Sequence, residues 1–364
     1  MQFHREHLAG CYCAYCACLI KRMDSFACRN QASAIMKVFI TGATGLIGRE
    51  LLHQLSADGY QISALYRSEE KRNDLLHLPV QWVKGSVEDP DCLEKGMSDC
   101  EAVIHAAAFA GIYAPVNKIM EVNYYGTRLV LDKARQSGIK KIVYVSSAGV
   151  FGPSGNGITD ETTVNGSFYA TPYDKIKSMT EDLALEYARA GLPVVVVNPT
   201  RLYGPGLMNE ANSVTLLILK YLRGQWKFIP GNGKAIGNYV FISDVARGIK
   251  MALEKGKPGE KYILGGENIS FDDFFNLLGK ISGRKHLMIH VPYPVMISVS
   301  SLLLAWAVLT RTRPPITPGL IRKYVQNWNV SSNKAIRELG YQPTPLREGL
   351  QITINWLKNM SSYA

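Results

Sequence analysis

Cysteine is scarce in most of this chain. Only Cys92 and Cys100 lie beyond residue 28 of the 364 residues. Two isolated cysteines cannot form the disulfide framework that is typical of small secreted domains. We therefore expect the main part of the chain to fold in a reducing compartment, as a cytoplasmic protein.

The other cysteines stand together near the amino terminus. Their spacing lacks a second pair of ligands at zinc-finger distance, so a zinc site is the less favoured interpretation. No metal site is predicted elsewhere. Because a strand-like apolar run begins at Met36, residues 1–35 are predicted to be a disordered tail or an upstream extension. The clustered cysteines are Cys11, Cys13, Cys16, Cys18 and Cys28.

The sequence also lacks a basic stripe with interleaved aromatic residues. The net charge is +11, but the lysines and arginines are scattered, which argues against nucleic acid as a partner. A positive field instead favours the collection of a phosphate-rich cofactor.

No apolar run is long enough for a clear membrane span. The longest, 295–309, is shorter than the ~20 residues that a spanning helix needs. We favour a buried or dimer-forming helix here. Because Arg311 and Arg313 follow the run, peripheral membrane contact through 295–309 is the alternative, and a true span is the least favoured.

From Met36 onward, short apolar runs alternate with longer segments of helical period. This alternation predicts an α/β fold, in which helices connect the parallel strands of a doubly wound sheet, the Rossmann fold. The predicted strands are 38–41, 61–66, 102–105, 141–146 and 193–198. The predicted helices are 46–57, 119–137 and 173–190.

After Pro199 the alternation loosens, and glycine-rich turns at 204–206 and 231–233 mark loops. We predict a cofactor-binding domain over residues 36–200, to which residues 235–265 return. Residues 201–234 and 266–360 are predicted to form a smaller, mixed lobe that binds the substrate.

A glycine motif follows the first predicted strand and opens the first predicted helix. Gly42, Gly45 and Gly48 would allow a tight turn, close approach of the backbone to a pyrophosphate, and helix packing. The amides at the start of the helix would bind the phosphates. The predicted cofactor contacts in this motif are Gly42, Thr44, Gly45, Leu46, Ile47 and Gly48.

The second predicted strand is followed by Arg67 instead of the acid that commonly contacts the adenosine ribose of NAD. A guanidinium can bind the extra phosphate of NADP through two hydrogen bonds, with Lys71 or Arg72 as helpers. NADP is therefore the predicted cofactor, and NAD is the alternative. Because Glu69 and Glu70 follow, Arg67 could instead be an ordinary surface residue.

Tyr173 and Lys177 are four residues apart and so share one face of a predicted helix. A tyrosine with its usual pKa near 10 is a poor acid–base catalyst at neutral pH. A neighbouring ammonium and a positive nicotinamide would favour the phenolate and lower that pKa. Ser146 and Ser147, at the end of a predicted strand, supply a hydroxyl that could polarise a carbonyl.

Together these motifs resemble the extended short-chain dehydrogenase/reductase superfamily over nearly all of residues 36–360. The glycine motif, the Ser-Tyr-Lys set, Asn123 within 122–127 and Asn198-Pro199-Thr200 match in order and spacing. The resemblance implies that Ser147, which precedes Ala148-Gly149, is the catalytic hydroxyl and that Tyr173 is the acid–base. It also implies that Lys177 and Tyr173 contact the cofactor and that Asn123 orders the proton relay.

Further cofactor contacts are implied by the same resemblance. The segment His105-Ala106-Ala107 would lie along the cofactor, and Pro199 beside the nicotinamide. One departure is Gly85-Ser86-Val87, where the family often has Gly-Asp. Ser86 can still form a hydrogen bond near the adenine, beside Val87. Family dimers use two helices, here 119–137 and 173–190, so a homodimer is expected.

The chemistry within this superfamily is narrowed by residues that are absent. Ala148 and Gly149 stand where sugar dehydratases carry an acid pair. Nucleotide-sugar epimerases continue the loop at 231–233 to an arginine that binds the sugar diphosphate, and here that position is Gly237. Arg311, Arg313 or Arg322 could replace that contact.

The favoured function is interconversion of a carbonyl and an alcohol on a small, largely apolar substrate, as in the dihydroflavonol-reductase and hydroxysteroid-dehydrogenase branch. Phe109, Tyr113 and Tyr203 would fit an apolar pocket. A nucleotide-sugar epimerase is the alternative. A non-catalytic NADP-binding regulator is the third hypothesis, although such proteins typically lack the Tyr-Lys pair.

Overall fold

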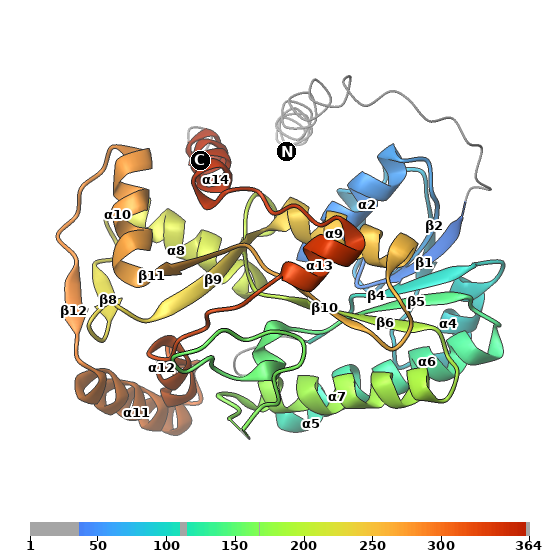
Figure 1. Ribbon diagram of the computed structural model, residues 1–364, viewed down its shortest axis with the longest axis horizontal. Helices are drawn as coiled ribbons and strands as arrows, with labels where there is room; N and C mark the ends of the chain where they lie inside the picture. The colour runs from blue at the N-terminus through green and yellow to red at the C-terminus, as the bar shows by residue number, and fades with distance from the viewer. Residues whose placement is uncertain (1–35, 110–114, 167, 362–364) are drawn as a thin grey trace. The chain divides into compact units, whose positions relative to one another are not determined.

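Seven strands form a parallel sheet in the order β10-β6-β5-β4-β1-β2-β3, which confirms the predicted fold class (Figure 1). The computed structural model describes residues 36–109, 115–166 and 168–361. Every neighbouring pair is parallel, so all carboxyl ends lie at one edge of the sheet. The strands are β1 (Lys37–Thr41), β2 (Gln61–Tyr66), β3 (Val80–Lys84), β4 (Ala102–His105), β5 (Lys141–Val145), β6 (Val194–Pro199) and β10 (Lys261–Leu264).

Helices cover both faces of this sheet. Along β1, Val38 and Ile40 join one hydrophobic cluster, whereas Phe39 joins the other, because successive side chains of a strand point to opposite faces. The first cluster includes residues of α2 (Leu46–Ala57), α9 (Ile242–Lys255) and α13 (Asn333–Leu339). The second includes residues of α4 (Pro90–Met97), α6 (Gly126–Gln136) and α7 (Pro172–Arg189).

Most of the predicted elements in the first half have nearly the predicted bounds. The predicted helix 119–137 differs, because it begins earlier, as α5 (Val116–Ile119), and contains a π-helical segment, η1 (Met120–Tyr125). A π-helical turn inserts one extra residue into a helix and is frequent at functional sites. The extra residue changes the direction of the side chains before α6, including that of Asn123, relative to a regular α-helix. The remaining helices in the first half of the chain are α3 (Glu69–Asn73) and the 3₁₀ helix η2 (Ala148–Phe151).

The chain after Pro199 forms two small sheets. β9 pairs with β7 in parallel and with β11 in antiparallel orientation, while β8 and β12 form a separate parallel pair. β10 returns to the large sheet beside β6. The exact boundaries of the substrate lobe stay a prediction. The elements are β7 (Arg201–Tyr203), η3 (Glu210–Asn212), α8 (Ser213–Leu222), β8 (Phe228–Pro230), β9 (Ile236–Phe241), β11 (Glu267–Ser270), α10 (Phe271–Ser282), β12 (Ile289–Val291), α11 (Tyr293–Thr310), α12 (Pro318–Tyr324) and α14 (Leu346–Ser361).

The apolar run 295–309 lies within α11, which is mostly exposed. Only Ser300 and Ala307 are buried in this helix, so the expectation of a helix buried within the chain is wrong, whereas the dimer-forming helix stays a prediction. Trp306 is 65 % exposed and Leu309 is 79 % exposed. Among the described helices, α11 alone has the length and apolar composition to cross a membrane.

Some predictions concern residues outside the described part of the chain. The tail or extension at 1–35, with its cysteine cluster, and the pocket residue Tyr113 belong to this group. Cys92 and Cys100 are described, and both are buried with free thiols.

Candidate active site

The order of the strands reverses between β1 and β4, and this is where ligands bind in doubly wound sheets. Gly42 follows β1 with a φ of 74°, in the left-handed region that favours glycine. A Cβ atom here would lie 2.6 Å from the main-chain carbon of Ala106 and the nitrogen of Ala107. The structure therefore brings the glycine motif against the segment after β4.

The start of α2 has donors suited to a pyrophosphate. Its N-cap, Gly45, provides no side-chain cap, so the amides of the first turn, from Leu46 through Gly48, lack an acceptor within the helix. A Cβ atom at Gly48 would overlap the Gly42 carbonyl, so only glycine allows the helix to begin this close to the loop. This cradle of free amides fits a dinucleotide cofactor.

Arg49 holds the glycine loop from behind, a contact that the sequence analysis missed. The buried guanidinium donates to the carbonyls of Thr44 at 3.3 Å and Lys71 at 2.7 Å, and pairs with Asp74 at 3.0 Å. It thus ties the loop after β1 to α3. Nothing in the local pattern distinguishes Arg49 from an ordinary arginine on an exposed helix face.

Arg67 lies at the end of β2, and its side chain is exposed. It forms no ion pair with any residue between 36 and 361 that the structure describes. Arg72, one of its predicted helpers, is already engaged, because it pairs with Glu69 at 2.9 Å and donates to the Tyr66 hydroxyl at 2.8 Å. Arg67 is therefore the more available guanidinium at this point of the sheet.

Ser86 and Val87 follow β3. The Ser86 hydroxyl donates to the Glu88 carboxylate at 2.8 Å. Val87 is buried, and a Cβ atom at Gly126 would lie 2.8 Å from its Cγ2 atom. These contacts fix the loop after β3 against the start of α6.

The His105 side chain has no free nitrogen. Nδ1 lies 2.6 Å from the Thr41 hydroxyl and Nε2 lies 2.8 Å from the Thr127 hydroxyl. Burial, with a smaller effect from Lys177, lowers the pKa of His105 to about 3, so the ring is neutral. A cofactor in the cradle would thus meet the main chain of this segment, not the imidazole.

Asn123, in the π-helical segment, is buried and bonded to the main chain of Phe109. Its Oδ1 atom accepts from the Phe109 amide at 2.7 Å, and its Nδ2 atom donates to the Phe109 carbonyl at 3.2 Å. In this arrangement Asn123 fixes the loop after β4.

Ser147 lies just beyond β5 and begins η2. Its hydroxyl accepts from the Gly149 amide at 3.1 Å, and the residue is partly exposed. Ser146 is buried beside Glu181, a carboxyl whose pKa is raised by burial and lowered in part by Ser146. Of the two serines, only Ser147 therefore offers a hydroxyl on the accessible side, and its catalytic role stays a prediction.

Lys177, on the second turn of α7, is 2 % exposed. Its ammonium donates to the Val145 carbonyl at 2.8 Å and to the Tyr144 hydroxyl at 3.3 Å. Burial lowers the pKa of Lys177 to about 8, although Glu181 opposes this shift. The lysine is thus held at the end of β5, close to the serine pair.

Tyr173, on the first turn of α7, is partly exposed, and its ring lies close enough to Tyr144 to influence it electrostatically. Burial, followed by the charge of Asp174, raises the pKa of Tyr173 above its usual value. This differs from the predicted lowering by Lys177, whose ammonium is bonded to Val145 and Tyr144. In this state Tyr173 keeps its proton at neutral pH.

An ion pair beside Ser147 was not predicted. Asp174 is buried and pairs with Lys323 of α12 at 2.7 Å. A Cβ atom at Gly149 would lie 3.0 Å from Asp174 Oδ1, 3.4 Å from Ser147 Oγ and 3.5 Å from Lys323 Nζ. The site has no room here for a larger residue 149. Sequence spacing could not reveal the pair, because its members are 149 positions apart.

Pro199 ends β6 at the same edge of the sheet, opposite Leu264 of β10. The preceding Asn198 donates to the Ser147 carbonyl at 3.3 Å and to Glu181 at 2.6 Å. These bonds tie the ends of β5 and β6 together, so Pro199 and Ser147 belong to one edge.

Gly237 stands where nucleotide-sugar epimerases have an arginine, and here the side chain of Arg201 occupies the adjacent space. A Cβ atom at Gly237 would lie 2.6 Å from Arg201 Nη1. The predicted replacements are exposed, and the nearest atom to a Cβ at Gly237 belongs to Arg201 instead. These replacements are Arg311, Arg313 and Arg322. The sequence analysis overlooked Arg201 because β7 and β9 pair only in the folded chain.

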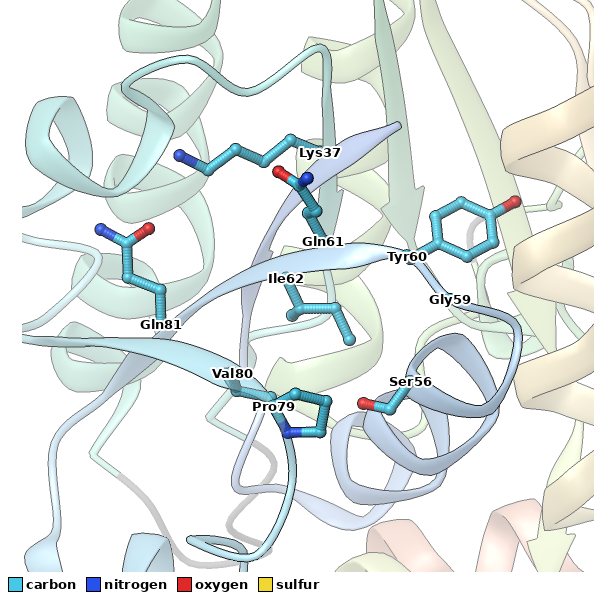
Figure 2. A pocket seen from close by; sticks show the side chains of 9 residues that line it. All are labelled: Lys37, Ser56, Gly59, Tyr60, Gln61, Ile62, Pro79, Val80 and Gln81. Atoms are coloured by element: carbon cyan, nitrogen blue, oxygen red, sulfur yellow. The ribbon is translucent and has the colours of Figure 1, made fainter. Parts of the chain in front are cut away.

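A surface hollow of about 530 Å³ lies at the opposite edge of the sheet (Figure 2). Lys37, Gln61 and Val80 line it, and they are the first residues of β1, β2 and β3. It is therefore separate from the glycine motif and Ser147, which follow carboxyl ends.

Residues 38–265 match the NAD dependent epimerase/dehydratase family. The chain is 30% identical to a "Putative dihydroflavonol 4-reductase" of Synechocystis, covering 88% of this chain and 94% of the relative. It is 29% identical to the sterol demethylase protein B of Methylococcus capsulatus, covering 89% and 98%. The solved UDP-glucose 4-epimerase of Thermotoga maritima superposes with a TM-score of 0.73 at 25% identity, covering 90% and 100%. With its parallel sheet and glycine cradle, the chain belongs to the NAD dependent epimerase/dehydratase family, and it is an NAD(P)-dependent enzyme of the extended short-chain dehydrogenase/reductase type.

Proposed function

We propose that the protein interconverts a carbonyl and an alcohol on a small, largely apolar substrate, with NADP as the preferred cofactor. The observation that supports this most is the arrangement around Ser147. Its accessible hydroxyl stands at the carboxyl edge of the sheet, next to the first turns of α7 that carry Tyr173 and Lys177. That edge also carries the glycine cradle.

In the direction of reduction, the bound nicotinamide would supply a hydride to the carbonyl carbon. The Ser147 hydroxyl would donate a hydrogen bond to the carbonyl oxygen and stabilise the charge that develops there. Tyr173, which burial keeps protonated, would transfer its proton to that oxygen and complete the alcohol. The Lys177 ammonium, held at the end of β5, would then stabilise the phenolate that remains.

The preference for NADP rests on Arg67. Its exposed guanidinium follows β2 and forms no ion pair among the described residues, although it contributes, after Lys118, to the lowered pKa of Glu88. It can therefore bind a phosphate through two hydrogen bonds. Several curated relatives act as reductases or dehydrogenases, among them a ketoreductase of Stigmatella aurantiaca that is 28% identical. These names favour the reductase branch over the alternatives.

The alternative is a nucleotide-sugar epimerase, which is favoured by the likeness to the solved UDP-glucose 4-epimerase. Gly237 itself has no side chain to bind a diphosphate, but the Arg201 guanidinium occupies the space beside it, so this position alone does not separate the two functions. Ala148 and Gly149 provide no acid pair after Ser147, and the Asp174 carboxylate beside Ser147 is paired with Lys323, so sugar dehydration is not supported.

We place the enzyme in the cytoplasm, at the face of a membrane that α11 contacts peripherally. We also propose a homodimer that pairs the helices η1–α6 and α7 with those of a second copy. The exposed apolar side chains of α11 and the cationic Arg311 and Arg313 that follow support the membrane contact.

The test of the proposed function is to follow oxidation of NADPH and NADH with ketones, sterol ketones, aldehydes and UDP-sugars. We expect consumption of NADPH with an apolar ketone, and a lower rate with NADH. Conversion of a UDP-sugar without any net change in the cofactor would contradict the proposal and establish the epimerase.

A further inference from the structure

Arg201 is the first residue of β7, two positions after Pro199. Its guanidinium lies among three aromatic rings, with its central carbon 5.7 Å from the ring centres of Tyr239 and Phe271 and 5.8 Å from that of Tyr324. These rings come from β9, α10 and α12, so the cation stands where three elements of the chain after Pro199 meet. Cation–π contacts of this length stabilise the charge weakly.

The hydrogen-bonding capacity of this guanidinium is largely unused. Nη1 donates to the Tyr239 hydroxyl at 3.4 Å, and Nη2 is buried without a hydrogen-bond partner. No carboxylate between residues 36 and 361 is described as pairing with Arg201. The side chain is otherwise partly exposed, but leaving the buried Nη2 without an acceptor is costly, because burial removes the water that would accept its hydrogen bonds. An anion delivered by a ligand would compensate this cost.

The absence of a side chain at Gly237 leaves space for the Arg201 guanidinium. A Cβ atom at Gly237 would lie 2.6 Å from Nη1, and the Tyr239 hydroxyl would lie 3.0 Å from the same Cβ. Any residue larger than glycine would displace the cation. The position of Arg201 is thus a consequence of a small residue on the paired strand.

Helix α12 connects this cation to the candidate active site. Lys323 pairs with Asp174 beside Ser147, and the next residue, Tyr324, contributes a ring to the surroundings of Arg201. Lys323 and Tyr324 are consecutive residues with Cα atoms about 3.8 Å apart, so the contact with Asp174 and the contact with Arg201 come from neighbouring parts of one short helix. A substrate with its carbonyl at Ser147 could therefore extend along α12 toward Arg201.

We propose that Arg201 binds an anionic oxygen group, a carboxylate or a phosphate, at the end of the substrate remote from the reacting carbonyl. This inference rests on the proposed function for the carbonyl end, and it adds that the substrate is amphipathic. Arg201 is a specificity-determining residue in this proposal, because it touches the substrate but not the reacting atoms.

The experiment uses a series of oxo fatty acids in which the ketone and the carboxylate are separated by increasing chain length, each with its methyl ester. The unmodified, NADPH-loaded protein should bind the acid of best length at least about tenfold more tightly than its neutral ester, a contrast typical of a charge-assisted hydrogen bond. Calorimetry measures binding, and NADPH oxidation measures KM and kcat. This comparison requires no variant.

Two variants assign the effect to Arg201. Arg201→Met should abolish the preference for the acid while leaving the ester unchanged, and Arg201→Lys should restore part of it, since a lysine keeps the charge but loses the planar fork. Arg337→Met, on the exposed face of α13, is the matched control and should behave as the unmodified protein. Melting temperature and NADPH affinity verify the fold of each variant.

The proposal is overturned if the unmodified protein binds acid and ester alike, or if Arg201→Met weakens both equally, as a purely structural arginine would. Titration with UDP-glucose distinguishes the source of the anion. Arg201-dependent binding of UDP-glucose, with no ketone reduced, would support the anion site but contradict the reductase. Reduction of esters without any preference for acids would support the reductase and reject the anion site.

Discussion

At the residue scale, roles in the candidate site follow from which groups remain free. Two adjacent serines follow β5, and only the family resemblance favoured Ser147 over Ser146. Burial separates them, since Ser146 lies against Glu181 while Ser147 remains accessible. His105 shows the opposite case, because both ring nitrogens are bonded to threonines and leave nothing for a ligand.

Lys177 should make the stability of the cofactor-free protein depend on pH. Its pKa is about 8 when folded and about 10.5 when unfolded, so between these values the unfolded chain holds a proton that the folded chain has released. Stability therefore increases with pH across this window. Relative to Lys177→Met, the unmodified protein should gain about 3 kcal/mol between pH 7 and 10.5.

Urea denaturation of both proteins at several pH values measures this gain. Taking the difference removes the contributions of all other titrating groups. A constant difference would mean that the buried ammonium keeps its ordinary pKa.

Arg67 should determine the choice of cofactor. Replacement by glutamine removes the charge available to the phosphate of NADP, so the KM for NADPH should rise about tenfold, as expected for loss of a hydrogen bond to a charged group. The KM for NADH should be unchanged, because NAD carries no such phosphate. Steady-state kinetics with both cofactors provide the measurement, with Arg337→Gln as the control.

Equal effects on NADPH and NADH would show that Arg67 acts on the loop and not on the phosphate.

At the scale of elements, five strands of the large sheet and the helices α2 and α7 could be predicted almost to the residue, because their apolar periodicity is regular. The shorter elements β3, α3 and α4 were not predicted. The helix at 293–310 could be predicted, but its exposure could not. A helix that is apolar all round gives no sign of which face is buried, and this one is covered only at Ser300 and Ala307. The apolar pattern of the sequence also did not predict the π-helical turn that contains Asn123.

Helix α11 should bind anionic vesicles. In a flotation assay with phosphatidylglycerol, the double variant Leu302→Glu/Leu309→Glu should bind at least about tenfold more weakly, since each leucine contributes about 1.5–3 kcal/mol when fully buried. Leu287→Glu is a matched control, because Leu287 is 82 % exposed but lies outside α11. High salt should weaken binding through Arg311 and Arg313.

If the double variant floats as well as the unmodified protein, α11 does not contact the membrane.

The ion pair between α7 and α12 should contribute to stability. Lys323→Met leaves the buried Asp174 without its partner, which should lower the free energy of unfolding by about 3 kcal/mol. Adding Asp174→Asn should recover much of this loss, because the unpaired charge is removed. Chemical denaturation of the two single variants and the double variant completes the cycle, and strict additivity would show that the pair does not interact.

At the scale of the whole molecule, the candidate site could be predicted because parallel strands bring their carboxyl ends to one edge. Residues as distant as Gly42 and Ala107 could thus be expected to meet. The smaller lobe lacks this regularity. Arg201 meets Gly237 and Tyr324 only through pairing of distant strands and packing of α12, so neither its position nor that of Lys323 could be predicted.

The central claim is that Tyr173 transfers the proton during carbonyl reduction. The most direct test is turnover of Tyr173→Phe, with NADPH affinity measured by calorimetry and Tyr60→Phe, at the opposite edge of the sheet, as the control. We predict that kcat falls by at least about a hundredfold, the typical contribution of general acid catalysis, while NADPH binds as before. Full turnover by Tyr173→Phe would contradict the account.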